Sequence, residues 1–255
     1  MRPCTRRIAS VPVEQAPWCR TTRAALPLHT EPMNVVFLFD VDNTLLDNDR
    51  VAADLRAHLD EEVGAEGGSL YWTFFEELRA ELGYADYLGA LQRYRAARPH
   101  EPRILTVSQF LITYPFANRL LPGSLDAVDH CATIGTTAIL SDGDVVFQPR
   151  KIHRSGLYDA VGGRVLVYIH KEHELDDVEE RLPADHYVLV DDKVRILAAV
   201  KAAWGSRVTT VWPRQGHYAL DVVDVARYPA PDIAIERIGD LVEHHVERLV
   251  GAAHR

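Results

Sequence analysis

One segment of this chain runs Val35-Val36-Phe37-Leu38-Phe39-Asp40-Val41-Asp42-Asn43-Thr44. Five apolar residues in a row are too few and too continuous for an amphipathic helix, so they predict a buried strand. Asp40 and Asp42 follow at the carboxyl end of this strand, which is where open α/β sheets bind ligands. Because alternate side chains of an extended backbone share a face, both carboxylates can face one crevice.

Two carboxylates held close together repel each other, and burying them is costly unless a cation or a proton offsets their charge. The pair Asp40 and Asp42 therefore favours a metal site. Mg²⁺ is the expected ion because hard cations prefer oxygen ligands. An Asp-rich turn after a strand is the plain alternative. On this segment alone the two interpretations are equally good.

Composition narrows the classes of partner. The apolar fraction of 47% and the charged fraction of 25% are ordinary for a globular protein, and no apolar run is long enough to span a membrane. A net charge of -9 without a basic stripe argues against nucleic acid as the main partner. Three cysteines lack zinc spacing and form no disulfide framework, which favours a cytoplasmic protein.

Residues 1–32 differ from the rest of the chain. They hold five arginines and two glutamates and show no apolar periodicity, so we expect a disordered or non-native extension. An organellar transit peptide also fits this composition. The simpler hypothesis is that Met33, the only methionine after Met1, is the true start.

From residue 34 onward, apolar runs alternate with helix-like segments. Strands are predicted at Val35–Phe39, Thr136–Leu140, Val165–Ile169, Tyr187–Val190, Val208–Trp212 and Ile233–Ile235. Helices are predicted between them at Ser124–Cys131, Arg195–Trp204 and Leu241–Val250. Such alternation predicts an α/β fold with a parallel sheet.

The alternation is interrupted early by a helical block. Helices are predicted there at Val51–Glu62, Leu70–Leu82, Asp86–Ala97 and Ser108–Phe116, with no convincing strand. We therefore expect an all-helical cap domain at residues 50–121, inserted into an α/β core of residues 33–49 and 122–255.

Three later strand ends also carry polar groups suited to phosphate chemistry. Ser141-Asp142-Gly143 offers a hydroxyl beside a flexible glycine, Lys171 offers a cation, and Asp191-Asp192 is a second acidic pair. Each alone is weak evidence, because turns and helix caps use the same residues. Their occurrence at successive strand ends of one sheet favours a catalytic site over the acidic turn.

These motifs, from Asp40-Val41-Asp42-Asn43-Thr44 to Asp191-Asp192, resemble the four motifs of the haloacid dehalogenase-like hydrolase superfamily, and the likeness covers residues 34 to 240. The resemblance implies a Rossmann-like core with a cap of the C1 type. It implies that Asp40 is a nucleophile forming an aspartyl-phosphate and that Asp42 is the general acid and then the base.

The same resemblance implies the remaining roles. Ser141 and Lys171, with Asp142 beside them, hold the phosphoryl group. Mg²⁺ binds a carboxylate oxygen of Asp40, the backbone carbonyl of Asp42 and the side chain of Asp192, while Asp191 acts through water. Position 196 is Ile where the commonest form of the last motif has another aspartate, which makes the adjacent pair the family's other form.

Asp42 separates the activities within the family. Dehalogenases resemble this chain but lack the second aspartate, since a halide leaving group needs no proton. We therefore expect a phosphatase acting on a small phosphorylated metabolite. A phosphomutase uses the same two aspartates, and a catalytically idle module that binds phosphometabolites is the alternative from another class. A receiver domain does not fit, because its phosphorylated aspartate lies in a middle strand.

Other residues receive less weight. Lys151 competes with Lys171 for the phosphate but lies in a helix-like stretch away from any strand end, and Lys193 is either solvated or a substrate contact. Tyr71-Trp72-Thr73-Phe74-Phe75 is expected in the core of the cap. Arg93, Arg95 and Arg98 are expected on a solvated face, with an anionic substrate as the lesser alternative. Residues 213–218 follow the fifth strand and are candidates, with little weight, for the edge of the crevice.

Overall fold

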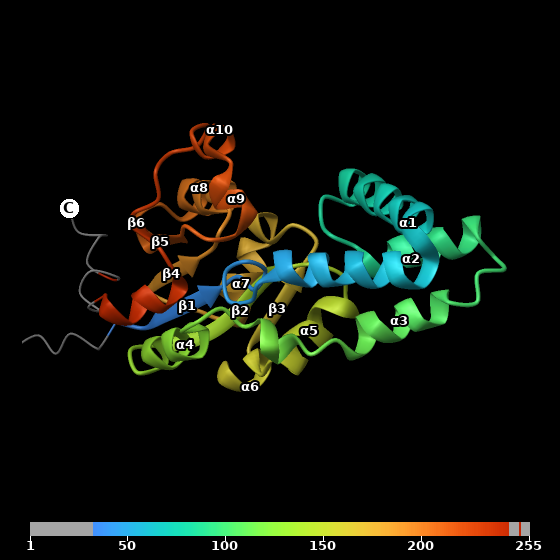
Figure 1. Ribbon diagram of the computed structural model, residues 1–255. Helices are drawn as coiled ribbons and strands as arrows, with labels where there is room; N and C mark the ends of the chain where they lie inside the picture. Colours follow the sequence, from blue (N-terminus) through green and yellow to red (C-terminus); the bar gives the residue numbers. More distant parts are fainter. Residues whose placement is uncertain (1–32, 245–249, 251–255) are drawn as a thin grey trace, which may run out of the picture. The chain divides into compact units, whose positions relative to one another are not determined.

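A six-stranded parallel sheet organises the computed structural model, which describes residues 33–244 and residue 250 (Figure 1). Its strands are β1 (Val35–Phe39), β2 (Thr136–Asp142), β3 (Val165–Tyr168), β4 (His186–Val190), β5 (Val208–Pro213) and β6 (Ile233–Ile235). Their order across the sheet is β3-β2-β1-β4-β5-β6. This confirms the predicted α/β, Rossmann-like fold class. Because the strand order reverses at β1, a crevice opens at the carboxyl ends of β1 and its neighbours.

Helices cover both faces of the sheet, which explains why β1 is apolar at every position. Phe37 and Phe39 point into one cluster of buried side chains, where Val128 of α4 also lies. Leu38 points into the other, with Leu197 of α8. Figure 1 shows α4 and α8 on opposite sides of the sheet.

The helices of the core are α4 (Ser124–Ala132), α5 (Phe147–Ser155), α6 (Leu157–Ala160), α7 (Leu175–Arg181), α8 (Val194–Trp204), α9 (Gly216–Leu220) and α10 (Val222–Val225). Short 3-10 helices are η1 (Phe116–Arg119), η2 (Lys171–His173), η3 (Gly205–Arg207) and η4 (Ile238–Glu243). The helix expected at Leu241–Val250 is partly wrong, because its first residues belong to η4; residues 245–249 lie outside the described residues. Residues 1–32, for which we expected a disordered or non-native extension, also lie outside the described residues.

Three helices form the insert that follows β1 and precedes α4, called the cap below: α1 (Asn48–Leu82), α2 (Tyr87–Ala97) and α3 (Ile104–Thr113). They lie together on one side of Figure 1. The two helices expected at residues 51–62 and 70–82 are the two halves of α1, which Gly64 separates with φ 75° and ψ 166°. None of the described helices is long and apolar enough to cross a membrane.

The chain passes between sheet and insert twice, and the two passages pair with each other. Leu46 and Leu120 form an isolated antiparallel bridge. The amide of Asp47 donates to the carbonyl of Arg119 at 2.7 Å, and the amide of Leu121 donates to the carbonyl of Leu45 at 3.0 Å. This short ribbon follows directly on the segment that carries Asp40 and Asp42, so the insert is joined to the chain beside those carboxylates.

Candidate active site

Three buried carboxylates meet at the carboxyl ends of β1 and β4. Asp40 follows β1, and Asp191 and Asp192 follow β4, its neighbour in the sheet. Each is at most 2% exposed, and one oxygen from each can be chosen so that all lie within 4.8 Å of one another. Neither carboxylate oxygen of Asp192 has a hydrogen-bond partner in the described part of the chain.

Lys171 balances part of this negative charge. It lies in η2, just after β3, and its Nζ is 2.6 Å from Oδ1 of Asp40 and 2.7 Å from Oδ2 of Asp191. The backbone amide of Lys171 donates to Oδ1 of Asp142 at 2.8 Å. The observed contact of Asp142 is therefore to the turn that carries the lysine, and its expected part in phosphate binding stays a prediction.

The protonation of the cluster is set by burial and by these lysines. Burial by itself raises the pKa of Asp40, but Lys171 and Lys193 outweigh it and hold that pKa below its ordinary value. Burial raises the pKa of Asp191 to about 6, and it raises that of Asp192 well above the ordinary value. Asp40 is therefore the most readily ionised of the three, which suits a nucleophile.

Hydroxyl groups flank Asp40 on both sides. Oγ of Ser141, in β2, is 3.4 Å from Oδ1 of Asp40, and Oγ1 of Thr44 is 3.4 Å from Oδ2. Gln148 of α5 donates to the Ser141 hydroxyl at 2.9 Å. Ser141 thus lies where the motif analysis placed it. The sequence motifs did not indicate Thr44 or Gln148 as site residues, although Thr44 ends the segment from Val35 to Thr44 that carries the first motif.

Asp42 has its own buried partner, which the sequence analysis did not anticipate. Nζ of Lys151 is 2.6 Å from Oδ1 of Asp42 and donates to Oδ1 of Asn48 at 3.0 Å. Lys151 lies in a helix, as expected, and its side chain is 1% exposed. The helix carries it into the site despite its distance from any strand end. Each of the two competing lysines therefore neutralises a different aspartate of the first motif.

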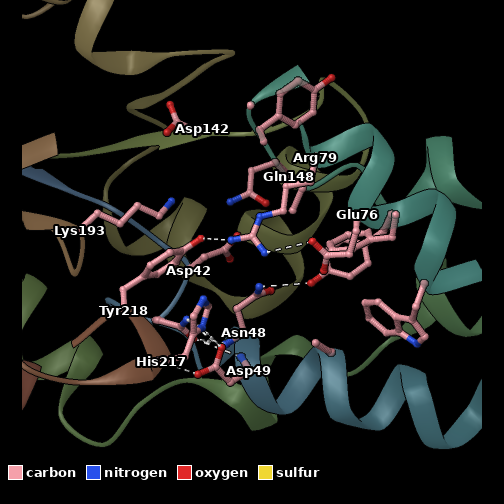
Figure 2. Close-up of a pocket in the computed structure, with 18 of the residues that line it drawn as sticks. Asp42, Asn48, Asp49, Glu76, Arg79, Asp142, Gln148, Lys193, His217 and Tyr218 are labelled. Atoms are coloured by element: carbon pink, nitrogen blue, oxygen red, sulfur yellow. Dashed lines mark hydrogen bonds and ion pairs between the residues drawn. The ribbon is translucent and has the colours of Figure 1, made fainter. Parts of the chain in front are cut away.

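A pocket of about 570 Å³ opens above Asp42 and is lined by residues of both core and cap (Figure 2). Lys193, which the sequence left open between solvent and substrate, lines it. His217 and Tyr218 line the pocket too. They belong to residues 213–218, which were expected to be substrate contacts only with little weight. Trp72 and Phe75 are buried in the cap, as expected, and also form part of the pocket wall.

Arg93 and Arg95 lie in α2 and Arg98 follows it, and none of the three lines this pocket. Arg93 pairs with Glu77 and Glu81, and Arg98 pairs with Glu66, all at exposed positions. Arg95 is exposed as well. Their placement is that of a solvated face.

Known structures share this fold. A haloacid dehalogenase-like hydrolase of Burkholderia xenovorans LB400 is 63% identical over 86% of this chain and 99% of its own, with a TM-score of 0.82. The chain belongs to the haloacid dehalogenase-like (HAD-like) hydrolases. The family resemblance drawn from the four motifs is therefore confirmed. No protein-family model matches the sequence, and no curated protein does.

Two more distant HAD-like structures share the fold. A HAD-hydrolase of Bacillus subtilis bound to magnesium is 17% identical over 83% of this chain and 98% of its own, with a TM-score of 0.54. The L-2-haloacid dehalogenase of Xanthobacter autotrophicus is 21% identical over 83% of this chain and 98% of its own, also with a TM-score of 0.54. The family therefore includes dehalogenases, and the bond that this hydrolase cleaves has to be argued from its own site.

The carboxylate cluster of this HAD-like hydrolase fits a divalent cation. The two oxygens of Asp192 are buried and lack hydrogen-bond partners, and oxygen donors suit Mg²⁺. Lys171 and Lys193 bring two positive charges to three carboxylates, so negative charge that attracts a cation remains when all three are ionised. The side chain of Asp42 is not part of the cluster, because it is engaged by Lys151. The backbone carbonyl of Asp42 therefore remains the expected Mg²⁺ ligand from this residue.

Proposed function

We propose that this HAD-like hydrolase is a Mg²⁺-dependent phosphatase that hydrolyses a small phosphate ester. The observation that carries the proposal is the second carboxylate, Asp42, which lines the pocket and is held by the buried Lys151. A phosphate ester leaves as an alkoxide and needs a proton, whereas a halide does not. A dehalogenase would have no use for an acid at this position. The cytoplasm, expected from the cysteine pattern, would supply such phosphorylated metabolites.

The proposed reaction has two steps. In the first, a carboxylate oxygen of Asp40 attacks phosphorus, the bond to the ester oxygen breaks, and Asp42 gives that oxygen its proton. In the second, Asp42 takes a proton from water, which attacks the aspartyl-phosphate and releases phosphate from Asp40. Lys171 and Ser141, both beside Asp40, hold the phosphoryl oxygens.

Asp40, Asp191 and Asp192, together with the backbone carbonyl of Asp42, would hold Mg²⁺. When bound, the ion supplies positive charge that offsets the carboxylates and the transferring phosphoryl group. Asp192 is the expected direct ligand because its oxygens are free of hydrogen bonds, whereas Asp191 also pairs with Lys171.

Replacement of the nucleophile tests the central step. With 4-nitrophenyl phosphate and Mg²⁺, Asp40→Asn is expected to abolish phosphate release, because an amide cannot attack phosphorus. Asp126→Asn, an exposed aspartate of α4, is the matched control and should keep the wild-type rate. Unchanged turnover in Asp40→Asn would exclude Asp40 as the nucleophile. A wild-type enzyme inactive on a panel of phosphate esters would instead favour the idle binding module.

The role of Asp42 can be tested with two leaving groups. Asp42→Asn should slow hydrolysis of an alkyl phosphate by about 100-fold or more, since its alkoxide must be protonated. Hydrolysis of 4-nitrophenyl phosphate should fall much less, because nitrophenolate leaves without a proton. These losses are compared as kcat/KM, which reports the first step, because kcat also includes the attack of water for which Asp42 is the base. Equal losses in kcat/KM on both substrates would contradict the acid role. Transfer of the phosphoryl group to a sugar phosphate instead of water would indicate the mutase.

A further inference from the structure

Three hydrogen-bond donors of the pocket lie together beside Asp42: Lys193, Arg79 and Tyr218, called here the donor cluster (Figure 2). Lys193 follows the acidic pair after β4, Tyr218 lies in α9, and Arg79 comes from the cap helix α1. The Arg79 guanidinium donates to the Tyr218 hydroxyl, and Nζ of Lys193 lies 5.2 Å from the centre of the Tyr218 ring. The cluster thus joins core and cap across the pocket.

The cluster offers donors and no vacant acceptor. Lysine and arginine side chains have no acceptor at all. The oxygen of Tyr218 accepts from Arg79, which leaves its own proton to donate. No acceptor for that proton is found in the described residues. A site whose groups all donate and carry positive charge is suited to an anion.

The carboxylates that line the pocket do not neutralise this charge. Asp42 pairs with Lys151, Asp49 accepts from the backbone amide of His217 at 2.9 Å, and Asp142 accepts from the backbone amide of Lys171 at 2.8 Å. None of these three carboxylates is found in an ion pair with the donor cluster in the described residues. Glu76 is 3.8 Å from Arg79 and is 63% exposed, so it screens that cation weakly.

Lys193 itself makes no ion pair in the part of the chain that the structure describes. Asp40 and Asp192 raise its pKa from nearby, but neither lies within ion-pair distance. Lys193 is half-buried in the pocket wall, so its ammonium can donate hydrogen bonds to an anion bound in the pocket. The position of Lys193 between the catalytic carboxylates and Tyr218 therefore favours a bound anion in the pocket.

We propose that the donor cluster binds a second anionic group, a carboxylate or a phosphate, on the leaving portion of the substrate. The inference rests on the proposed phosphatase function. Asp42, which would protonate the leaving oxygen, lies beside the cluster, so a group held there belongs to the leaving alcohol (Figure 2). The substrate class is then a small phosphate ester with another anionic group. Because Arg79 belongs to the cap, this group also draws cap and core together.

Matched substrates test the proposal in the Mg²⁺-loaded enzyme. We expect kcat/KM for 3-phosphooxypropanoate or propane-1,3-diyl bisphosphate to exceed that for 3-phosphooxypropanamide by about tenfold or more, because a hydrogen bond between charged groups is the stronger kind. The better of the two anions identifies the second group. Arg79→Gln and Lys193→Gln should each reduce this preference toward unity. Arg93→Gln, the same change in an exposed ion pair of the cap, should leave the preference intact.

Binding of phosphonates separates this inference from the proposed function, because a phosphonate carbon–phosphorus bond is not hydrolysed. By calorimetry, the enzyme should bind 3-phosphonopropanoate about tenfold more tightly than propylphosphonate, and Arg79→Gln should lose that difference. Equal binding of the two, or equal turnover of ester and amide, would overturn the donor cluster while leaving the phosphatase intact. If the enzyme hydrolyses no ester but still binds 3-phosphonopropanoate selectively, the proposed phosphatase function is wrong and anion binding by the donor cluster stands.

Discussion

At the scale of single residues, the site separates its two first-motif aspartates by giving each a lysine. Lys171 neutralises Asp40 from the end of β3, and Lys151 holds Asp42 from α5. The two carboxylates therefore do not compete for one cation, although they are two residues apart. Lys151 also contacts Asn48, the first residue of the cap helix α1, so the orientation of Asp42 is tied to the start of the cap.

Lys151→Met should misplace Asp42 without touching the nucleophile. We expect kcat/KM, which reports the first step, to fall by about 10- to 100-fold for an alkyl phosphate and by less for 4-nitrophenyl phosphate, because only the alkyl ester needs the proton. Lys201→Met is the matched control, since its ion pair with Asp232 lies beside the first residue of β5, at the amino ends of the strands and away from the site. Equal losses on both esters would assign Lys151 a role in phosphate binding instead.

The sequence predicts the residues at strand ends but not those that reach the site from helices. Asp40, Ser141 and Asp191 stand directly at the carboxyl ends of apolar runs, and that local pattern places them. Gln148 and Lys151 lie in α5, and which side of α5 faces the site depends on how the helix packs against the cap and β3. No period within nine residues of helix distinguishes a lysine that points inward from one in solvent.

At the scale of elements, the cap depends on one glycine that divides its longest helix. Gly64 has φ 75° and ψ 166°, a conformation that is essentially restricted to glycine. The bend brings Arg56 of the first half over the Trp72 ring of the second, 4.3 Å from its centre. Both residues line the pocket, so the shape of the pocket wall depends on this bend.

Gly64→Ala should destabilise the cap by about 1–3 kcal/mol through backbone strain alone, because no atom lies within 4 Å of the added Cβ. Hydrogen exchange should then quicken in α1 and α2 while β1 and β4 stay protected. Glu61→Ala, at an exposed position three residues earlier, should leave exchange unchanged. Faster exchange throughout the sheet would contradict a local effect.

Strands and helices differ in how far the sequence defines them here. The buried strands are continuous apolar runs, and all six are found where these runs predict them. The ends of helices depend on capping residues and turns, which the pattern of apolar residues does not mark clearly. The first two of the four expected cap helices therefore form one bent helix, α1, and the expected C-terminal helix begins as the 3-10 helix η4.

At the scale of the whole molecule, the cluster of Asp40, Asp191 and Asp192 links folding to pH and to Mg²⁺. The pKa of Asp191 is raised to about 6 in the folded protein, against 3.8 as its ordinary value. Between about pH 4 and about pH 6 the folded state therefore holds a proton that the unfolded state has lost. This contribution to stability is present below about pH 4 and is lost as the pH rises through about 6.

Mg²⁺ binds ionised carboxylates, so its stabilising effect should begin to grow over the same range, as Asp191 ionises. It should grow further at higher pH, because the pKa of Asp192 is raised well above its ordinary value. We expect the rise in Tm on adding saturating Mg²⁺ to be small at about pH 4 and to become large above about pH 6. Asp192→Asn should remove most of that rise, while Asp126→Asn should preserve it. A rise independent of pH would contradict a site at these carboxylates.

The paired passages at Leu46 and Leu120 have a consequence for how such enzymes diversify. Because the two ends of the insert are neighbours in space, the whole cap occupies the place of a tight turn between β1 and α4. A different insert, longer or shorter, can replace it without shifting the register of any strand. Evolution can therefore exchange the part that chooses the substrate while it inherits unchanged the strand ends that would break the bond.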